Sequence, residues 1–227
     1  MTFSEKFYQN FIQDARWTYL TQGLKSTLII TVFSVLIGVA IGFLVAIIGS
    51  TYSKSGKLKI LNGICQVYLT VFRGTPVMVQ LLIMFYVIMA SSTNKLFVAI
   101  LTFGINSGAY VSEIVRSGIM SIDNGQFEAG RSLGFNYVQT MRYIIIPQAF
   151  KNVLPALMNE LIVLLKETSV CGYIGLMDLT KGGDIIRSRT YEAFLPLMAV
   201  AIIYLIMVCG LSALAKRVER RLRIGDN

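Results

Sequence analysis

The apolar residues of this chain are gathered in long runs that are separated by shorter polar stretches. Five such runs lie at about residues 24–48, 76–92, 96–115, 150–174 and 194–215. A helix needs about 20 predominantly apolar residues to cross the hydrocarbon core of a bilayer. The pattern therefore predicts five transmembrane helices.

The composition agrees with a membrane location. The chain has 227 residues, of which 55% are hydrophobic and only 15% are charged, and its mean hydropathy is +0.64. This is too apolar for an ordinary soluble domain. Barrel strands would alternate apolar and polar residues over segments of about ten, whereas "LIITVFSVLIGVAIGFLVAII" shows no alternation. We therefore predict an all-α integral membrane protein.

The first twenty residues differ from the rest. They contain several charges, among them Glu5 and Arg16, and no long apolar core, so they do not resemble a cleavable signal peptide. Phe3, Phe7 and Phe11 recur every four residues and would give a helix one apolar face, suited to a membrane surface. We expect residues 1–20 to be an amphipathic lead-in, with a plain soluble segment as the alternative, and residues 21–227 to form a single transmembrane domain.

Lys and Arg set the orientation, because cytoplasmic loops carry an excess of them. One side of the predicted membrane collects three groups: Lys54, Lys57 and Lys59; Arg116, Arg131, Arg142 and Lys151; and Lys216, Arg217, Arg220, Arg221 and Arg223. The other side has fewer lysine and arginine residues. The N-terminus is therefore expected outside and the C-terminus inside, so the net charge of +9 is mainly a topology signal. The charges are spread over loops rather than gathered in one patch, which argues against nucleic-acid binding.

Several kinds of chemistry are missing. The chain has no histidine, and its three cysteines, Cys65, Cys171 and Cys209, are far apart in apolar surroundings, so an enzyme or metal site is not expected. Gly56-Lys57 is preceded by Thr51 and followed by Leu58, where a phosphate-binding loop needs glycine and a hydroxyl. We expect no cofactor on this chain, and any ATP and magnesium must be bound by another chain.

One polar stretch, "EAGRSLGFNYVQTMRYIIIP" (128–147), interrupts the apolar pattern. It is too polar to cross the membrane. Glycine at 134 and proline at 147 predict a short helix, a turn at Gly134, and a second helix that enters the next span. Held between two spans in a cytosolic loop of about residues 120–148, such a helix pair can transmit motion to both.

This stretch resembles the EAA loop of binding-protein-dependent ABC importer permeases. Glu128-Ala129-Gly130, Gly134, Ile144 and Pro147 follow the loop's pattern, with Gly130 in place of alanine and Ile146 in place of leucine. Gly130 is familiar in the branch of polar amino acid permeases. The segments "FRGTPVMVQ", "INSGAYVSEIVRSGI", "NELIVLLKETS" and "KRVERRLRI" also resemble that branch, in its order and spacing.

The resemblance implies a five-helix permease subunit in the bacterial cytoplasmic (inner) membrane. Its implied partners are a cytosolic ATPase dimer, a second permease chain (identical or a sister), and an extracellular or periplasmic solute-binding protein that delivers an amino acid. The coupling residues would be Glu128, Ala129, Gly130, Ser132, Leu133, Gly134 and Phe135. The chain itself would not be an enzyme.

Charged residues within predicted spans are candidates for substrate contact, because each costs roughly 2.5–3.5 kcal/mol to insert. Glu160 lies near mid-membrane, where its carboxylate would hold an ammonium group or a cationic side chain. Arg73, beside the break at Gly74-Thr75-Pro76, would hold a carboxylate, or it forms a structural pair with Glu160 or Glu113. We also assign substrate contact to Thr75, Ser107 and Tyr110.

Glu160 favours a basic amino acid such as arginine, lysine or histidine as the substrate. Glutamine, glutamate or cystine is the alternative for the same importer class. A passive channel, a secondary transporter or an intramembrane enzyme subunit are further rivals, but none of them accounts for an EAA-like helix.

Overall fold

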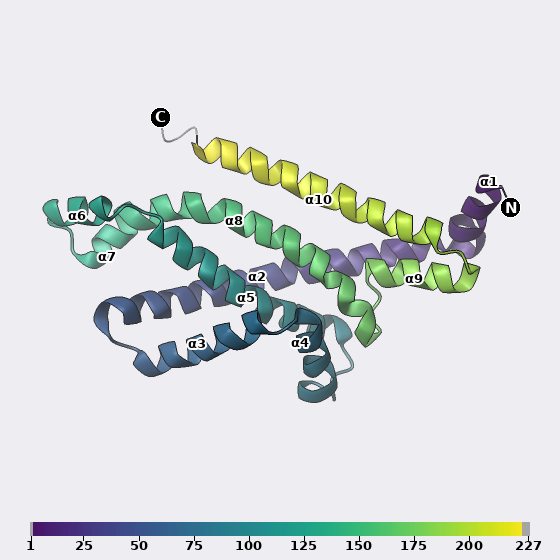
Figure 1. Cartoon of the computed structure of the whole chain (residues 1–227), viewed down its shortest axis with the longest axis horizontal. Coiled ribbons are helices and arrows are strands. Elements are labelled where there is room, and N and C mark those ends of the chain that lie inside the picture. Colours follow the sequence, from purple (N-terminus) through teal and green to yellow (C-terminus); the bar gives the residue numbers. More distant parts are fainter. Residues whose placement is uncertain (1, 224–227) are drawn as a thin grey trace.

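The computed structural model describes residues 2–223, without the side chains of Lys54, Ser55 and Arg223. The side chains of Lys54 and Arg223, both used in the charge comparison, and residues 224–227 of the predicted domain lie outside this description. The described part is helical throughout (Figure 1). Its α-helices are α1 (Phe3–Phe7), α2 (Trp17–Ser55), α3 (Lys59–Gly74), α4 (Val77–Ile83), α5 (Lys95–Met120), α6 (Asn124–Ser132), α7 (Tyr137–Thr140), α8 (Ile146–Glu167), α9 (Leu179–Thr190) and α10 (Phe194–Arg223).

Short irregular helices join several of these. Tyr8–Ile12, Met84–Ile88 and Met141–Ile145 are π-helical, and Gln13–Ala15 and Thr168–Ile174 are 3-10 helical. The π-helical stretch before α8 precedes Pro147, which has no N–H to donate to the preceding turn. The second helix of the polar stretch, α7, thus continues through this π-helical stretch into α8 without an intervening loop, as the sequence predicts.

Three of the five predicted spans correspond to helices that are long and apolar enough to cross a membrane. These are Trp17–Ser53, Lys95–Met120 and Phe194–Leu222. The predicted span 76–92 is only one arm of a bent pair, Lys59–Gly74 and Val77–Ile88, whose axes meet at 110°. The predicted span 150–174 falls on α8, which is not among the candidates because Lys151, Asn159 and Glu160 interrupt its apolar residues. The described residues thus contain three candidate spans, or four if the bent pair is one.

The region between the first two predicted spans is more ordered than the sequence indicates. Residues 59–74 form α3. Outward-facing residues such as Ile60, Ile64 and Val67 are exposed, while Cys65 and Leu69 are buried against α2 and α5. This apolar face is interrupted by polar residues, which is why no long apolar run marks it in the sequence.

Helices α2 and α5 approach closely through glycines. A Cβ at Gly38 would lie 2.9 Å from the Ser107 side chain, and one at Gly108 would lie 2.8 Å from Ile41. Gly42 and Gly104 meet Val111 and Ile37 in the same way. Each helix therefore carries two glycines four residues apart, the spacing that lets membrane helices pack with their backbones close together.

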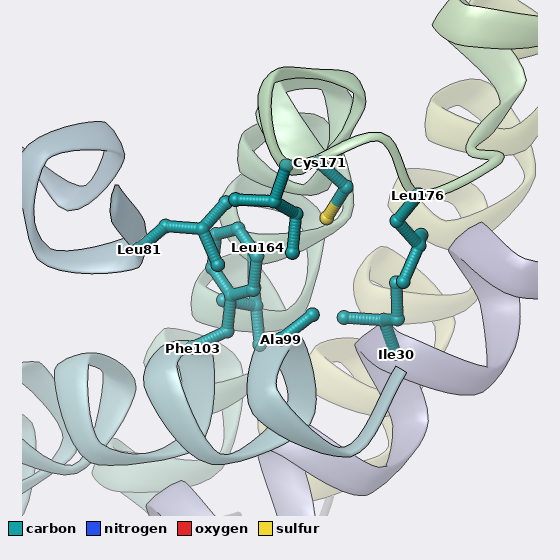
Figure 2. Close-up of a cluster of buried hydrophobic side chains, with 8 residues drawn as sticks. Ile30, Leu81, Ala99, Phe103, Leu164, Cys171 and Leu176 are labelled. Atoms are coloured by element: carbon teal, nitrogen blue, oxygen red, sulfur yellow. The ribbon is translucent and has the colours of Figure 1, made fainter. Parts of the chain in front are cut away.

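The core lies where α2, α4, α5 and α8 meet. Figure 2 shows Ile30, Leu81, Phe103 and Leu164 converging there, with Cys171 and Leu176 from the segment after α8. Most of these side chains are fully buried. This cluster holds the first half of the chain against the second and fixes the positions of α5 and α8 relative to each other.

Helix α9 packs along the beginning of α2. Its N-cap, Asp178, is fully buried and accepts hydrogen bonds from the backbone N–H groups of Lys181 and Gly172, at 2.6 and 3.2 Å. Burial raises the pKa of Asp178 to about 6, against the opposing effect of these hydrogen bonds. Gly23 and Gly182 leave room for backbone contact between α2 and α9.

Candidate functional site

A groove of about 580 Å³ lies between α3, α5 and α8. Three of the five residues predicted to contact substrate line it, namely Arg73, Tyr110 and Glu160. Its other lining residues are Glu113, Ile114, Ser117, Gly118, Ser121, Asn152 and Ala156. The tertiary structure therefore brings together most of a set that the sequence places on three separate segments.

Glu160 is the acidic group on the α8 side of the groove. Its Oε1 accepts a hydrogen bond of 2.7 Å from the Ser107 hydroxyl of α5, and Ser107 is fully buried. Ser107 lies at the close contact with Gly38, so its side chain has little freedom. Ser107, the fourth residue predicted to contact substrate, thus holds the Glu160 carboxylate through a hydrogen bond and does not itself line the groove.

Arg73 lines the groove from α3 but is paired with an acid other than Glu160. Its Nη1 lies 3.4 Å from Oε1 of Glu113, and Glu113 also binds Arg116 at 2.8 Å. The sequence left open whether Arg73 pairs with Glu160 or with Glu113, and in the structure it pairs with Glu113. The Arg73 side chain is 43% exposed, so it keeps free surface toward the groove.

Thr75 is placed elsewhere. It lies in the bend between α3 and α4, where its hydroxyl donates to the Val71 carbonyl at 2.8 Å and accepts from the Gln80 amide at 2.8 Å. It is not among the residues that line the groove. Both of these hydrogen bonds are to residues of α3 and α4, on either side of the bend.

Two residues that hold this bend, Gln80 and Asn106, were not predicted from the sequence. Pro76 has no N–H, so the Phe72 carbonyl four residues earlier has no helical partner. The side-chain amides of Gln80 and Asn106 both donate to it, at 3.0 and 3.2 Å, and Asn106 also donates to Gln80 Oε1 at 2.9 Å. The signal available in the sequence was a polar amide, Gln80, within an apolar run and four residues after a proline.

The groove extends from Glu160 toward the polar stretch. At that end Asn152 of α8 donates to the Ser121 hydroxyl, just after α5, at 2.8 Å. One turn before Asn152, Gln148 donates to Gln126 of α6 at 3.2 Å. These contacts join the groove walls to α6.

The polar stretch folds as a helix, a turn and a helix. The predicted coupling residues start at Glu128, but α6 begins earlier, at Asn124, and is capped by Asp123, whose carboxylate accepts from the Gly125 N–H at 2.6 Å. Glu128 therefore lies in the middle of α6 rather than near its start. Leu133, Gly134 and Phe135 form the turn that follows α6.

This turn is a Schellman motif. Gly134 has φ of +77°, its N–H bonds the Arg131 carbonyl at 2.9 Å, and the Phe135 N–H bonds the Gly130 carbonyl at 3.0 Å. Of the predicted coupling residues, Glu128, Ala129, Ser132, Leu133 and Gly134 are exposed, Phe135 is half-buried, and Gly130 is buried.

Gly130 is where α6 touches α7. A Cβ there would lie 2.6 Å from the Thr140 side chain. The glycine that departs from the EAA pattern thus permits the close approach of the two helices.

Comparison with known proteins places the chain in a family. Residues 38–224 match the model of the binding-protein-dependent transport system inner membrane component. The putative glutamine transport system permease protein GlnP of Rickettsia typhi is 36% identical over 96% of both chains. The arginine transport system permease protein ArtQ of Bacillus subtilis is 36% identical over 92% of this chain and 94% of its own.

The fold agrees with these relationships. A crystal structure of an amino acid ABC transporter with histidines has a TM-score of 0.85 to this structure, at 41% sequence identity, and the match covers 93% of this chain and 98% of that one. The model match spans well over half of the chain, from α2 to the end of α10. The chain therefore belongs to the family of binding-protein-dependent transport system inner membrane components, which are membrane permease subunits and not enzymes.

Proposed function

We propose that this chain forms the translocation path for a basic amino acid in an ATP-driven importer. One observation carries the substrate class: Glu160, held by Ser107, presents a carboxylate in a groove of about 580 Å³ between α3, α5 and α8. A carboxylate at this depth is costly unless it is paired. Glu160 has no cationic partner within 4 Å among the described residues, so a cationic ligand would provide one.

The opposite wall suits the other end of an amino acid. Arg73 would bind the α-carboxylate in competition with Glu113, whose second partner, Arg116, remains available to it. Tyr110, which is 38% exposed, would contact the ligand between the two charged groups. Ser107 would act by orienting Glu160, and Thr75 by shaping the bend that carries Arg73.

The polar stretch would be the coupling element. The exposed residues of α6 and its turn, Glu128, Ala129, Ser132, Leu133 and Gly134, would dock on a cytosolic ATPase dimer together with Phe135 and Gly130. ATP and magnesium would be bound by that dimer. The contacts of Gln148 with Gln126 and of Asn152 with Ser121 would carry the motion to the groove walls.

We further propose five spans, with the N-terminus outside and the C-terminus inside, in one transmembrane domain preceded by the lead-in of residues 1–20. The arrangement supports this topology, since α6, α7, the α2–α3 connection and the end of α10 lie toward one end of the molecule, and α1 and α9 lie at the other (Figure 1). The remaining partners would be a second permease chain and a solute-binding protein at the α9 end.

Glutamine is the second candidate substrate. The observation that favours it is the similarity to the putative glutamine transport system permease protein GlnP of Rickettsia typhi, which extends over 96% of this chain. A carboxylate can bind the α-ammonium of any amino acid, so Glu160 by itself is compatible with this reading.

The charge of Glu160 separates the two candidates. We expect Glu160→Gln to reduce arginine-stimulated ATP hydrolysis roughly tenfold, the equivalent of about 1.4 kcal/mol, and glutamine-stimulated hydrolysis much less. The measurement uses the permease, its ATPase and its binding protein in liposomes, with arginine, lysine, histidine, glutamine, glutamate and cystine tested in turn.

Glu167→Gln is the matched control, because it makes the same charge change at the end of the same helix and outside the groove. It should affect all substrates equally. An equal loss for arginine and glutamine in Glu160→Gln would reject the preference for a cation, and no stimulation of the intact complex by any amino acid would reject the amino acid assignment.

A further inference from the structure

The opening segment of the chain is fastened to the turn between α9 and α10. Asn10 is fully buried, although it is polar. Its amide nitrogen donates to the Lys6 carbonyl at 2.8 Å and to Glu192 Oε2 at 3.2 Å, and its Oδ1 accepts from the Thr190 hydroxyl at 2.8 Å. We call Asn10, Thr190 and Glu192 the latch.

The latch is supported on both sides. Glu192 also caps α10, because its carboxylate accepts from the backbone N–H groups of Phe194 and Leu195, at 3.1 and 3.2 Å. On the other side Phe11 is buried in a cluster with Leu179, Ile186 and Val200. Of the three phenylalanines predicted to share one membrane-facing side, only Phe3 and Phe7 are therefore exposed, because Phe11 packs into the protein instead. The stretch Tyr8–Ile12 is therefore packed against α9 and the beginning of α10, and α1 projects from it at the end marked N (Figure 1).

The outer surface of this corner is rich in exposed aromatic and apolar side chains. Tyr191 is 95% exposed and Trp17 is 50% exposed. The full set, which we call the collar, is Phe3, Phe7, Tyr8, Ile12, Trp17, Tyr191 and Phe194. Three of these, Tyr8, Trp17 and Tyr191, combine an apolar ring with a polar group, which is typical of side chains at membrane interfaces.

The collar is continuous with the apolar surface of α10. Phe194 is the first residue of that helix, and the exposed residues Leu197, Met198 and Ile202 follow it. Since α10 is a candidate span with few buried residues, the same lipid that covers it reaches the collar. This continuity favours a lipid surface over a protein partner.

We propose that the opening segment is a fixed interfacial anchor: the latch holds it on the α9–α10 turn, and the collar lies in the headgroup layer of the membrane. The anchor ties α9 to the bilayer surface, so α9 and the lead-in move as one body. The proposal needs only that this end of the molecule lies at a membrane surface. It does not depend on the substrate or on which side is outside.

Trp17 is the only tryptophan of the chain and serves as a probe. The full chain is reconstituted in phosphatidylcholine–phosphatidylglycerol vesicles whose acyl chains are brominated either near the headgroup or near the terminal methyl. We expect quenching of Trp17 fluorescence to be about twofold stronger with bromine near the headgroup, the depth of interfacial side chains. Phe3→Trp in a Trp17→Phe chain should give the same pattern for the lead-in.

Two further variants of that Trp17→Phe chain complete the test. Val138→Trp, at the exposed surface of α7, is the control and should be quenched by aqueous iodide and not by lipid. Adding Thr190→Val to Phe3→Trp removes one latch hydroxyl at nearly constant shape, and should shift quenching of the lead-in toward iodide.

Three results would overturn the proposal. Iodide quenching of Phe3→Trp without lipid quenching would remove the anchor. Unchanged lipid quenching after Thr190→Val would show that the latch does not hold the segment. Protection of Phe3→Trp from iodide only when the solute-binding protein is added would make the collar a protein interface instead.

Discussion

At the scale of single residues, the polar stretch depends on glycines that have two different roles. Gly134 is required for its backbone conformation, because its φ is +77°. It is not required for space, because a Cβ there would meet no atom within 4 Å. Gly130 is required for its size, because its neighbour Thr140 occupies the space of a side chain. Both glycines stand out in the sequence, but only the structure separates the two reasons.

Gly134→Val should uncouple ATP hydrolysis from uptake. A β-branched residue in the left-handed region costs roughly 1–2 kcal/mol, which would open the Schellman turn and displace Leu133 and Phe135. Hydrolysis should persist in liposomes while substrate uptake falls roughly tenfold, the equivalent of about 1.4 kcal/mol.

Gly134→Asn is the rescue variant, because asparagine tolerates this conformation. Gly63→Val is the matched control, since Gly63 lies in α3 with ordinary helical φ and nothing within 4 Å of its Cβ. Normal uptake by Gly134→Val would contradict the coupling role.

At the scale of elements, the bend between α3 and α4 is only partly predictable from its own sequence. The sequence indicates a break at Gly74-Thr75-Pro76 and a carbonyl freed by the proline. It does not show that Gln80 and Asn106 share that carbonyl, because Asn106 comes from α5, 34 residues away from Phe72. The angle of 110° follows from these contacts and from the packing of Leu81 in the core.

Gln80→Ala should weaken the bend. It leaves the Phe72 carbonyl with Asn106 alone and takes a partner from Asn106, and a buried polar group that loses a partner costs about 1–3 kcal/mol. We expect a lower thermal unfolding midpoint in detergent and weaker substrate stimulation of ATP hydrolysis, because Arg73 is carried by this bend.

Gln66→Ala provides the comparison, because Gln66 is an exposed glutamine on α3. It should leave both quantities nearly unchanged. If Gln80→Ala unfolded at the same temperature as Gln66→Ala, the two amides would not be holding the bend.

At the scale of the whole molecule, the charged ends predict the topology. The polar stretch and the end of α10 lie at one end, and the N-terminus lies with α9 at the other (Figure 1). The positive-inside rule then places the polar stretch in the cytosol. This orientation remains a prediction.

Cysteine labelling in cells would test it. Ser188 of α9 and Ser132 of α6 are both exposed, so Ser188→Cys and Ser132→Cys form a matched pair in a chain from which Cys65, Cys171 and Cys209 have been removed. Without the ATPase present, a membrane-impermeant maleimide should label Ser188→Cys in intact cells and Ser132→Cys only after permeabilisation. The reverse result would invert the topology.

The sequence by itself determined the all-helical membrane class, the helix–turn–helix of the polar stretch and the family resemblance, because apolar run length, glycine and proline positions and short motifs are local properties. Only the tertiary structure decided that Arg73 pairs with Glu113, that Ser107 holds Glu160, that the apolar run 76–92 belongs to a bent pair, and that Asn10 fastens the opening segment to α9 and α10. Each of these depends on contacts between residues far apart in the chain. Such pairs are selected by how the helices pack, and no local pattern records that packing.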